Sequence, residues 1–166
     1  MPFSFLPKVQ TAKLTDITAE HLRSWGVKLL MLDFDNTIVP YTTIVPTGEM
    51  EAWLREMNSL PDIKLCIVSN SRNDRVPKFC RERNMEVITH AKKPFPKGIN
   101  ECLRQFGMEP KDAALVGDQI FTDTLGANGA GVRSILVEAI DNHNFWLKAR
   151  HVLELPFIFL ARNRRM

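Results

Sequence analysis

The 166-residue chain is 45% hydrophobic and 25% charged, which is typical of a globular protein with a sizeable core. We expect a single domain over residues 1–166, because this length leaves little room for a second core. A net charge of +3 favours anionic substrates or surfaces without identifying one. The longest candidate membrane stretch, 155–161, is far shorter than the ~20 residues that span a bilayer, and no secretory signal pattern opens the chain.

The three cysteines, Cys66, Cys80 and Cys102, are odd in number and form no C-x-x-C pair. We interpret them as reduced thiols of a cytoplasmic protein, since this scattered set favours neither a disulfide framework nor a zinc site.

The first part of the chain predicts short elements around one buried strand. Residues 1–9 indicate a terminal arm that packs over the core, with a membrane-touching segment as the alternative. A helix is expected over 15–25, and the apolar run 28–32 predicts a central strand. The β-branched, proline-containing stretch 38–48 favours an extended flap. A helix then begins near Thr47, and its spacing predicts a buried stripe of Met50, Trp53, Leu54 and Met57.

Strands and helices alternate in the rest of the chain. Strands are expected at 65–68, 87–88, 113–116 and 132–137, with helices at 74–83, 98–106 and 122–130 between or after them. This alternation predicts an α/β fold with a right-handed, doubly wound parallel sheet. The tail, 145–166, combines apolar and basic residues. It predicts either a closing helix with a solvated basic end or a segment that meets an anionic membrane.

Two carboxylates, Asp33 and Asp35, follow the first buried strand directly. They project to the same side of an extended segment, where like charges repel unless a cation, a proton or hydrogen bonds stabilise them. The spacing therefore indicates a nucleophilic carboxylate, a second acid for proton transfer and a bound divalent cation. Acids at such a position also serve as helix caps or turn residues, which is the plainer alternative.

Polar residues follow three later strand-like runs as well. Ser69 and Asn70 end one run, Lys93 follows the next, and Asp118 ends the third. The carboxyl ends of parallel strands meet at one edge of a sheet, where ligands bind in open α/β folds. We therefore expect these groups to lie together.

The joint pattern resembles the haloacid dehalogenase superfamily of phosphatases. It consists of D-x-D-x-T from Asp33, a hydrophobic run ending in Ser69, K-P-x-P from Lys93, and G-D-x-x-x-x-D from Gly117. The short connections look most like the class III-type branch, and within it like the YqeG-like family and the phosphatidylglycerophosphate phosphatases. This resemblance implies a Rossmann-like fold. The intervals 37–69 and 70–93 are too short for a cap domain, so we expect an open site.

The resemblance implies a role for each residue of the motifs. Asp33 is the expected nucleophile, which forms an aspartyl-phosphate, and Asp35 is the expected general acid and base. Thr37 would orient the loop and Asp35. Ser69, Asn70 and Lys93 would bind the phosphoryl group.

The implied cofactor is Mg²⁺, held by Asp33, Asp118 and the backbone carbonyl of Asp35. Asp123 would either support this site or cap the helix expected at 122–130.

We thus expect an Mg²⁺-dependent phosphomonoesterase, with phosphatidylglycerophosphate as the substrate that the resemblance favours. A phosphatase of a soluble sugar phosphate or nucleotide, and a non-catalytic phosphate-binding domain, are the alternatives. We expect a cytoplasmic location, and peripheral contact with an anionic phospholipid membrane is an open question. No nucleic-acid partner is expected.

Overall fold

The computed structural model describes residues 4–141 and 145–166, and for 145–151 the backbone alone. The first three residues of the expected terminal arm and the side chains at 145–151 of the expected tail lie outside this description. In the described ranges, no helix is long and apolar enough to cross a membrane.

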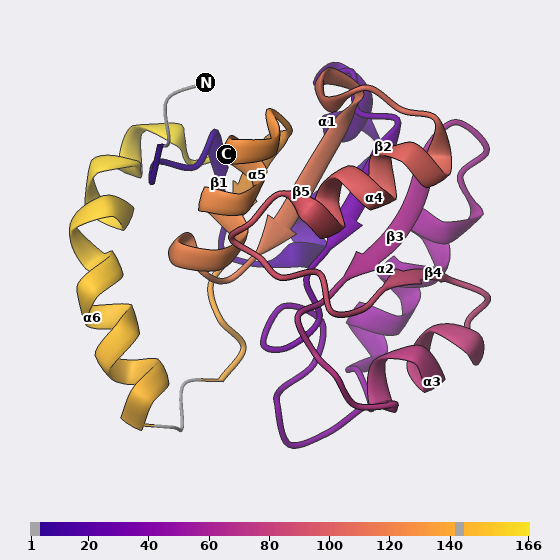
Figure 1. Cartoon of the computed structure of the whole chain (residues 1–166), viewed down its shortest axis with the longest axis horizontal. Coiled ribbons are helices and arrows are strands. Elements are labelled where there is room, and N and C mark those ends of the chain that lie inside the picture. Colours follow the sequence, from indigo (N-terminus) through magenta and orange to yellow (C-terminus); the bar gives the residue numbers. More distant parts are fainter. Residues whose placement is uncertain (1–3, 142–144) are drawn as a thin grey trace.

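Six parallel strands form one sheet in the order β1-β6-β5-β2-β3-β4 (Figure 1). Their bounds are β1 Val9–Gln10, β2 Leu29–Leu32, β3 Lys64–Val68, β4 Glu86–Ile88, β5 Ala113–Gly117 and β6 Arg133–Leu136. The chain runs outward from β2 through β3 to β4, and later from β5 to β6 on the other side. This reversal makes the sheet doubly wound, as predicted, and places a topological switch point between β2 and β5.

The central strands are apolar on both faces because helices cover both faces. In β2, Leu30 and Leu32 join one core cluster, whereas Leu29 and Met31 join the other, as the two-residue period of a strand requires. The first cluster includes side chains of α1 Ala19–Ser24, α2 Gly48–Ser59 and α3 Arg75–Arg81, and the second includes those of α4 Lys97–Phe106 and α5 Leu125–Ala130.

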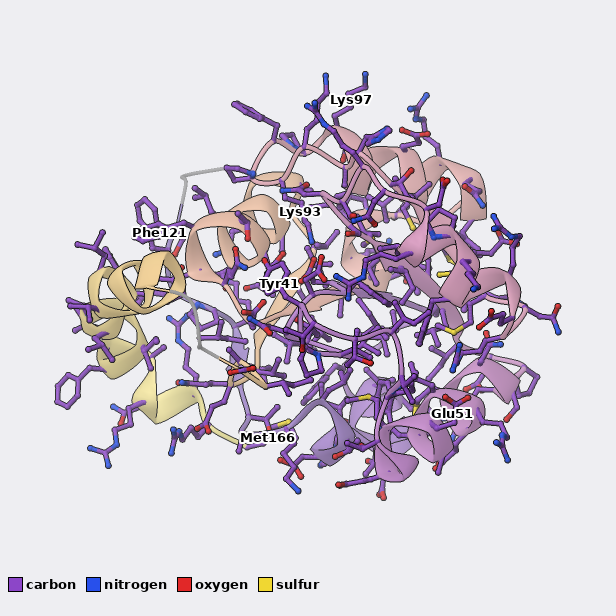
Figure 2. The ribbon with its side chains drawn as sticks, turned by 90° about the horizontal axis from the view of Figure 1, so that it is seen from below. Tyr41, Glu51, Lys93, Lys97, Phe121 and Met166 are labelled. Atoms are coloured by element: carbon purple, nitrogen blue, oxygen red, sulfur yellow. The ribbon has the colours of Figure 1, made fainter. Side chains whose placement is uncertain are left out.

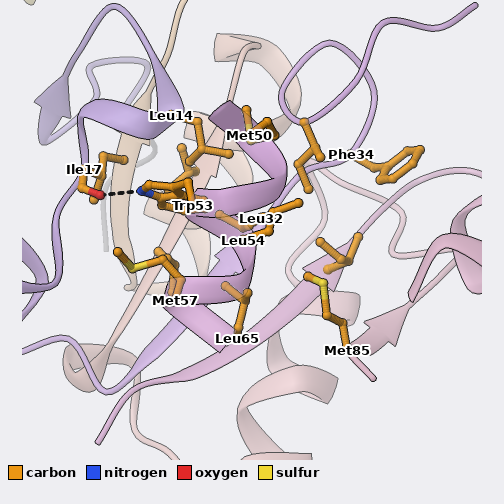
Figure 3. Packing of buried hydrophobic residues seen from close by; sticks show 14 of the residues in the cluster. Leu14, Ile17, Leu32, Phe34, Met50, Trp53, Leu54, Met57, Leu65 and Met85 are labelled. Atoms are coloured by element: carbon orange, nitrogen blue, oxygen red, sulfur yellow. Dashed lines mark hydrogen bonds between the residues drawn. The ribbon is translucent and has the colours of Figure 1, made fainter. Parts of the chain in front are cut away.

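Helix α2 packs with the stripe that its spacing predicts. Met50, Trp53, Leu54 and Met57 are all buried, and Figure 3 shows them facing Leu32 and Leu65 of the sheet. The indole Nε1 of Trp53 donates a hydrogen bond of 2.7 Å to the carbonyl of Ile17. The buried indole is therefore satisfied, and the bond ties α2 to the segment that precedes α1.

The N-terminal region differs from the prediction in two respects. Val9 and Gln10 form the edge strand β1 beside β6, where only a covering arm was expected, because a two-residue strand carries no periodic signal. The helix expected over 15–25 is split into a 3-10 turn, Leu14–Asp16, and α1, which begins at Ala19. Thr18 is its N-cap and accepts a hydrogen bond from the backbone N–H of His21.

The C-terminal third differs as well. The helix expected at 122–130 begins earlier, as a π-helical turn, η3 Ile120–Thr124, that leads into α5. The tail forms α6 Phe145–Leu160, which lies along one edge of the molecule, followed by the 3-10 turn η4 Arg162–Arg164 (Figure 1). The last residue, Met166, donates its backbone N–H to Gln10, so the C-terminus ends beside β1. A further 3-10 turn, η2 Pro110–Asp112, precedes β5.

Candidate active site

The loops after β2, β4 and β5 bring acidic and basic side chains together at the switch point. Asp33 directly follows β2, and its backbone N–H donates to the carbonyl of Val116 in β5 at 2.8 Å. This bond extends the β2–β5 ladder by one residue, so the Asp33 side chain leaves the sheet next to Gly117 and Asp118. The topology thus places the two sequence-distant aspartates side by side.

Lys93 lies at the centre of the site. Its ammonium Nζ is 2.6 Å from Asp33 Oδ1 and 2.8 Å from Asp123 Oδ1, and its side chain is buried. Burial lowers the pKa of Lys93, but the carboxylates of Asp123 and Asp33 outweigh this effect and raise it above its ordinary value. Lys93 is therefore a permanent cation. In Figure 2, Lys93 lies inside the outline of the molecule, whereas Lys97 extends outward.

Asp123 is held against the end of β5. Its Oδ2 accepts a hydrogen bond from the backbone N–H of Gln119, which is the N-cap of η3. Gly117 makes this approach possible, because a Cβ at that position would overlap the Asp123 side chain. Asp123 thus serves both as a partner of Lys93 and as a local cap. Burial raises its pKa to about 6, although Lys93 opposes the rise.

The loop that follows Asp35 turns back sharply toward the site. Asn36 has a φ of 62°, in the left-handed region that asparagine adopts more readily than most residues. After this turn, the Thr37 hydroxyl lies 3.4 Å from Asp33 Oδ2 and 3.4 Å from Asp118 Oδ1. Thr37 therefore contacts the two expected metal ligands and not Asp35, where the resemblance had placed it.

Asp35 instead forms an ion pair with Arg75, at 2.8 Å between Oδ1 and Nη1. Burial raises the pKa of Asp35 above its usual value, and the nearby Arg75 cation opposes the rise. The same guanidinium donates to backbone carbonyls of the 38–48 flap, namely those of Pro40, Tyr41 and Thr43. Arg75 thus joins the flap to Asp35.

Ser69 and Asn70 occupy the loop after β3, next to the β4 loop. The buried Ser69 hydroxyl accepts a hydrogen bond from the backbone N–H of Ser71, which leaves its own proton available for donation. The Asn70 carboxamide accepts from the Lys93 N–H at 2.8 Å and donates to the Lys93 carbonyl at 2.9 Å. The Asn70 side chain therefore positions the lysine backbone, a role that the sequence did not indicate.

The carboxylates fit a divalent cation. Asp33, Asp118 and Asp123 each offer an oxygen, and these oxygens all lie within 4.8 Å of one another. Asp33 and Asp123 share the ammonium of Lys93, and Asp118 brings a third carboxylate to the same place. An all-oxygen donor set suits a hard ion such as Mg²⁺. Both Asp123 oxygens are engaged, Oδ1 by Lys93 and Oδ2 by the Gln119 N–H, whereas only Oδ1 of Asp33 faces Lys93. Asp33 and Asp118 are therefore the ligands that this arrangement favours.

Sequence reasoning missed two residues that contact this region. Arg75 carries no motif signal, since its contact with Asp35 depends on the paths of two loops. Glu154 of α6 is also buried, and its Oε1 accepts from the backbone N–H groups of Ile120 and Phe121 at 3.0 and 3.1 Å. These two N–H groups belong to the first two residues of η3, the turn that carries Asp123. In the sequence, the only indication of such a role is that Glu154 is the single acid of the apolar and basic tail, 145–166.

The comparisons with known proteins agree with the motifs. The model of the family described as mitochondrial PGP phosphatase matches residues 1–140. A probable phosphatase, YqeG, of Bacillus subtilis is 35% identical over 133 residues, which cover 80% of this chain and 77% of that protein. The chloroplastic and mitochondrial phosphatidylglycerophosphate phosphatase 1 of Arabidopsis thaliana is 23% identical over 95% of this chain, which spans only 47% of that enzyme.

Solved structures support the fold. A haloacid dehalogenase superfamily hydrolase of Geobacter sulfurreducens superposes with a TM-score of 0.50 at 16% identity, over 78% of this chain and 96% of that one. Together with the motifs and the sheet topology, these matches identify a phosphoric monoester hydrolase of this superfamily. The chain therefore belongs to the mitochondrial PGP phosphatase family, together with its YqeG-type relatives.

Proposed function

We propose that the chain is an Mg²⁺-dependent phosphatase that works through an aspartyl-phosphate on Asp33. The observation that carries the proposal is the contact of 2.6 Å between Lys93 and Asp33, which lie beside two further carboxylates, the buried Asp123 and the partly buried Asp118. One Asp33 oxygen faces Lys93, and the other lies near Thr37. This arrangement holds the carboxylate in a fixed orientation, as a nucleophile requires.

In the first step, an Asp33 oxygen attacks phosphorus while the bond from phosphorus to the ester oxygen breaks. Asp35, in its protonated form, donates its proton to the leaving oxygen, so the alcohol departs neutral. Its raised pKa supports this role, because burial keeps a larger share of this carboxyl protonated. The ammonium of Lys93 and the hydroxyl of Ser69 stabilise the charge on the phosphoryl oxygens.

In the second step, the ionised Asp35 takes a proton from water as the water oxygen attacks phosphorus. The acyl phosphate bond breaks, inorganic phosphate leaves, and Asp33 returns to its carboxylate form. Asp33 and Asp118 would hold the metal ion, with the Asp35 carbonyl as a third candidate, and the bound Mg²⁺ supplies positive charge that offsets charge on the transferring group. Asp123 keeps Lys93 directed at Asp33.

The site has few covering elements, which favours a bulky ester. Between Thr37 and Ser69 the chain forms only the flap, α2 and β3, and between Asn70 and Lys93 only α3 and β4. We therefore retain a single domain over residues 1–166 without a cap. A phospholipid headgroup could enter such a site from a membrane surface.

Phosphatidylglycerophosphate is our preferred substrate. The family match and the activity of the Arabidopsis relative support it. Helix α6 adds an observation from this chain, because it exposes apolar side chains close to a basic terminus. These are Val152, Leu153, Leu155, Phe159 and Leu160, followed by Arg162, Arg164 and Arg165. Apolar residues beside arginines suit peripheral contact with an anionic membrane.

The test is phosphate release from phosphatidylglycerophosphate in anionic vesicles, with and without Mg²⁺, for the parent and for Asp33→Asn. We expect release that needs Mg²⁺ and disappears in the variant. Turnover of soluble sugar phosphates but not of the lipid would keep the mechanism and favour the alternative substrate class. Absence of turnover on every ester would contradict the proposed function.

The membrane contact has its own matched control. Replacing Phe159 by Ser should weaken binding to anionic vesicles, whereas Phe95→Ser should not, although both rings are 69% exposed. Equal vesicle binding by the two variants would contradict a docking role of α6.

A further inference from the structure

We infer that a basic pocket beside the active site binds a second phosphate group of the substrate, one that is not hydrolysed. The inference rests on the proposed function, because it narrows the substrates of the same site to phosphomonoesters that carry another phosphate. The pocket is lined by Asn70, Arg72, His90 and Lys92 and has a volume of about 450 Å³. This is large enough for a phosphate and part of the group that links it to the scissile ester.

The charge of the pocket points to an anionic occupant. Arg72 and Lys92 are exposed, and neither forms an ion pair within the part of the chain that the structure describes. The two cations beside the proposed catalytic acids are paired instead, since Arg75 forms an ion pair with Asp35 and Lys93 forms one with Asp33. A pocket lined by charges of one sign concentrates counter-ions. A phosphate there would supply the acceptor oxygens that these donors lack.

The pocket is physically joined to the site of phosphoryl transfer. Asn70 lines the pocket, and its carboxamide forms two hydrogen bonds with the backbone of Lys93, one to the N–H and one to the carbonyl. Lys92 and Lys93 are neighbours that face in opposite ways, because Lys92 is exposed while Lys93 is 5% exposed and reaches Asp33. A substrate bound at Asp33 would thus have the pocket next to it.

The backbone around the pocket is held in an unusual conformation. His90 and Lys92 have φ values of 52° and 58°, a region that residues with a Cβ seldom adopt. Between them Ala91 is buried, and it packs so closely on Gly98 that a Cβ on the glycine would overlap its backbone. The Ala91 N–H also donates to the Ser69 carbonyl at 3.0 Å. The fold therefore maintains a strained segment that presents two basic side chains outward, which is typical of functional sites.

Two kinds of substrate would bring a second phosphate to the pocket. One is a lipid whose headgroup contains a phosphodiester, and the other is a soluble bisphosphate. Both place a non-scissile anion a few bonds from the phosphomonoester. Either would engage Arg72 and Lys92, and the experiment separates the two sources.

The test compares a substrate that carries the second phosphate, together with the glycerol attached to it, with one that lacks both. Glycerol 3-phosphate lacks it, and the deacylated headgroup, glycerophosphoglycerol phosphate, has it. In the double variant Arg72→Gln/Lys92→Gln, we expect the ratio of kcat/KM for the headgroup over that for glycerol 3-phosphate to fall about tenfold or more. The control Arg81→Gln/Lys97→Gln removes the same charge from exposed positions outside the pocket and should leave the ratio within roughly twofold of the parent.

Two further experiments identify the kind of substrate that carries the second phosphate and distinguish failure of the pocket from failure of the proposed function. Phosphatidylglycerophosphate in neutral vesicles and fructose 1,6-bisphosphate in solution show whether the parent prefers a lipid or a soluble bisphosphate. Binding of the headgroup to Asp33→Asn, with and without the pocket substitutions, is measured by calorimetry and does not need turnover. If no ester is hydrolysed, the proposed function fails, while a Kd raised about tenfold by the pocket substitutions still supports the pocket. An unchanged ratio or an unchanged Kd would overturn the inference.

Discussion

Arg75 Nη1 lies 2.8 Å from Asp35 Oδ1, and the same guanidinium holds three carbonyls of the flap. The proposed general acid is therefore coupled to the flap through Arg75. One side chain thus contacts the flap and opposes the rise that burial causes in the pKa of Asp35.

Replacing Arg75 by Met should shift the pH dependence of catalysis. Arg75 lowers the pKa of Asp35 against the raising effect of burial, so its removal raises that pKa further. Asp35 must be protonated to act on the leaving group, so kcat/KM falls as the pH rises through its pKa. In the variant this alkaline fall should occur at higher pH. The control Arg81→Met, at an exposed position of the same helix, should keep the parent profile. An unmoved alkaline limb in Arg75→Met would contradict the assignment of Asp35.

Replacing Lys93 by Met should abolish most activity and destabilise the fold. One buried donor at a transferring group typically contributes a factor of about 10²–10³ in rate. The variant also leaves Asp33 and Asp123 without their shared cation, a loss of about 3–5 kcal/mol in the free energy of unfolding. Steady-state kinetics on a generic phosphomonoester and urea unfolding measure the two effects. Lys97→Met, at an exposed position, should change neither, and parent-like kinetics in Lys93→Met would refute the role of this lysine.

Replacing Glu154 by Leu should weaken metal binding without touching the site directly. Glu154 accepts from two backbone N–H groups at the start of η3, and unpaired buried donors cost about 1–3 kcal/mol each. The turn that begins two residues after the expected ligand Asp118, and that holds Asp123, should loosen, so the Mg²⁺ concentration for half-maximal activity should rise. Glu154→Gln keeps one acceptor oxygen and should lie between the parent and Glu154→Leu. The surface variant Glu101→Leu is the control. A parent-like Mg²⁺ dependence in Glu154→Leu would show that α6 does not support the site.

The three cysteines should be unreactive in the native protein. Cys66, Cys80 and Cys102 are free and buried. Burial raises the pKa of Cys80 to about 12, and hydrogen bonding with Cys102, together with burial, raises that of Cys66 as well. The thiolates of Cys66 and Cys80, which are the reactive form, are therefore scarce at neutral pH, and burial shields Cys102 from reagents. Mass spectrometry after treatment with iodoacetamide should find no adduct on the native protein and three on the urea-unfolded chain. Rapid native labelling of any of them would contradict the described core.

The sequence predicts the parts of this molecule that depend on local pattern. Strand ends carry Asp33, Lys93 and Asp118, and a parallel sheet brings such ends together whatever the details of the loops. The stripe of α2 follows from helical spacing in the same way. The edge strand β1 could not be predicted, because Val9 and Gln10 are too few for a period and pair only once β6 is in place.

Contacts that depend on loop paths lie beyond local pattern. Arg75 meets Asp35 across 40 positions, and Glu154 meets Ile120 across 34. The partner of the Thr37 hydroxyl was also misplaced, since the turn at Asn36 directs that side chain toward Asp33 and Asp118. Such contacts follow from the packed fold and not from the residues next to them.

The covalent intermediate is the most direct test of the mechanism. The variant Asp35→Asn should form the aspartyl-phosphate from p-nitrophenyl phosphate, whose leaving group needs no proton, but should hydrolyse it slowly because no base activates the water. Acid quenching and peptide mass spectrometry should then find one phosphoryl group on the peptide that contains Asp33. The double variant Asp33→Asn/Asp35→Asn should carry none. A phosphoryl group at another residue, or full turnover in Asp33→Asn, would contradict the account.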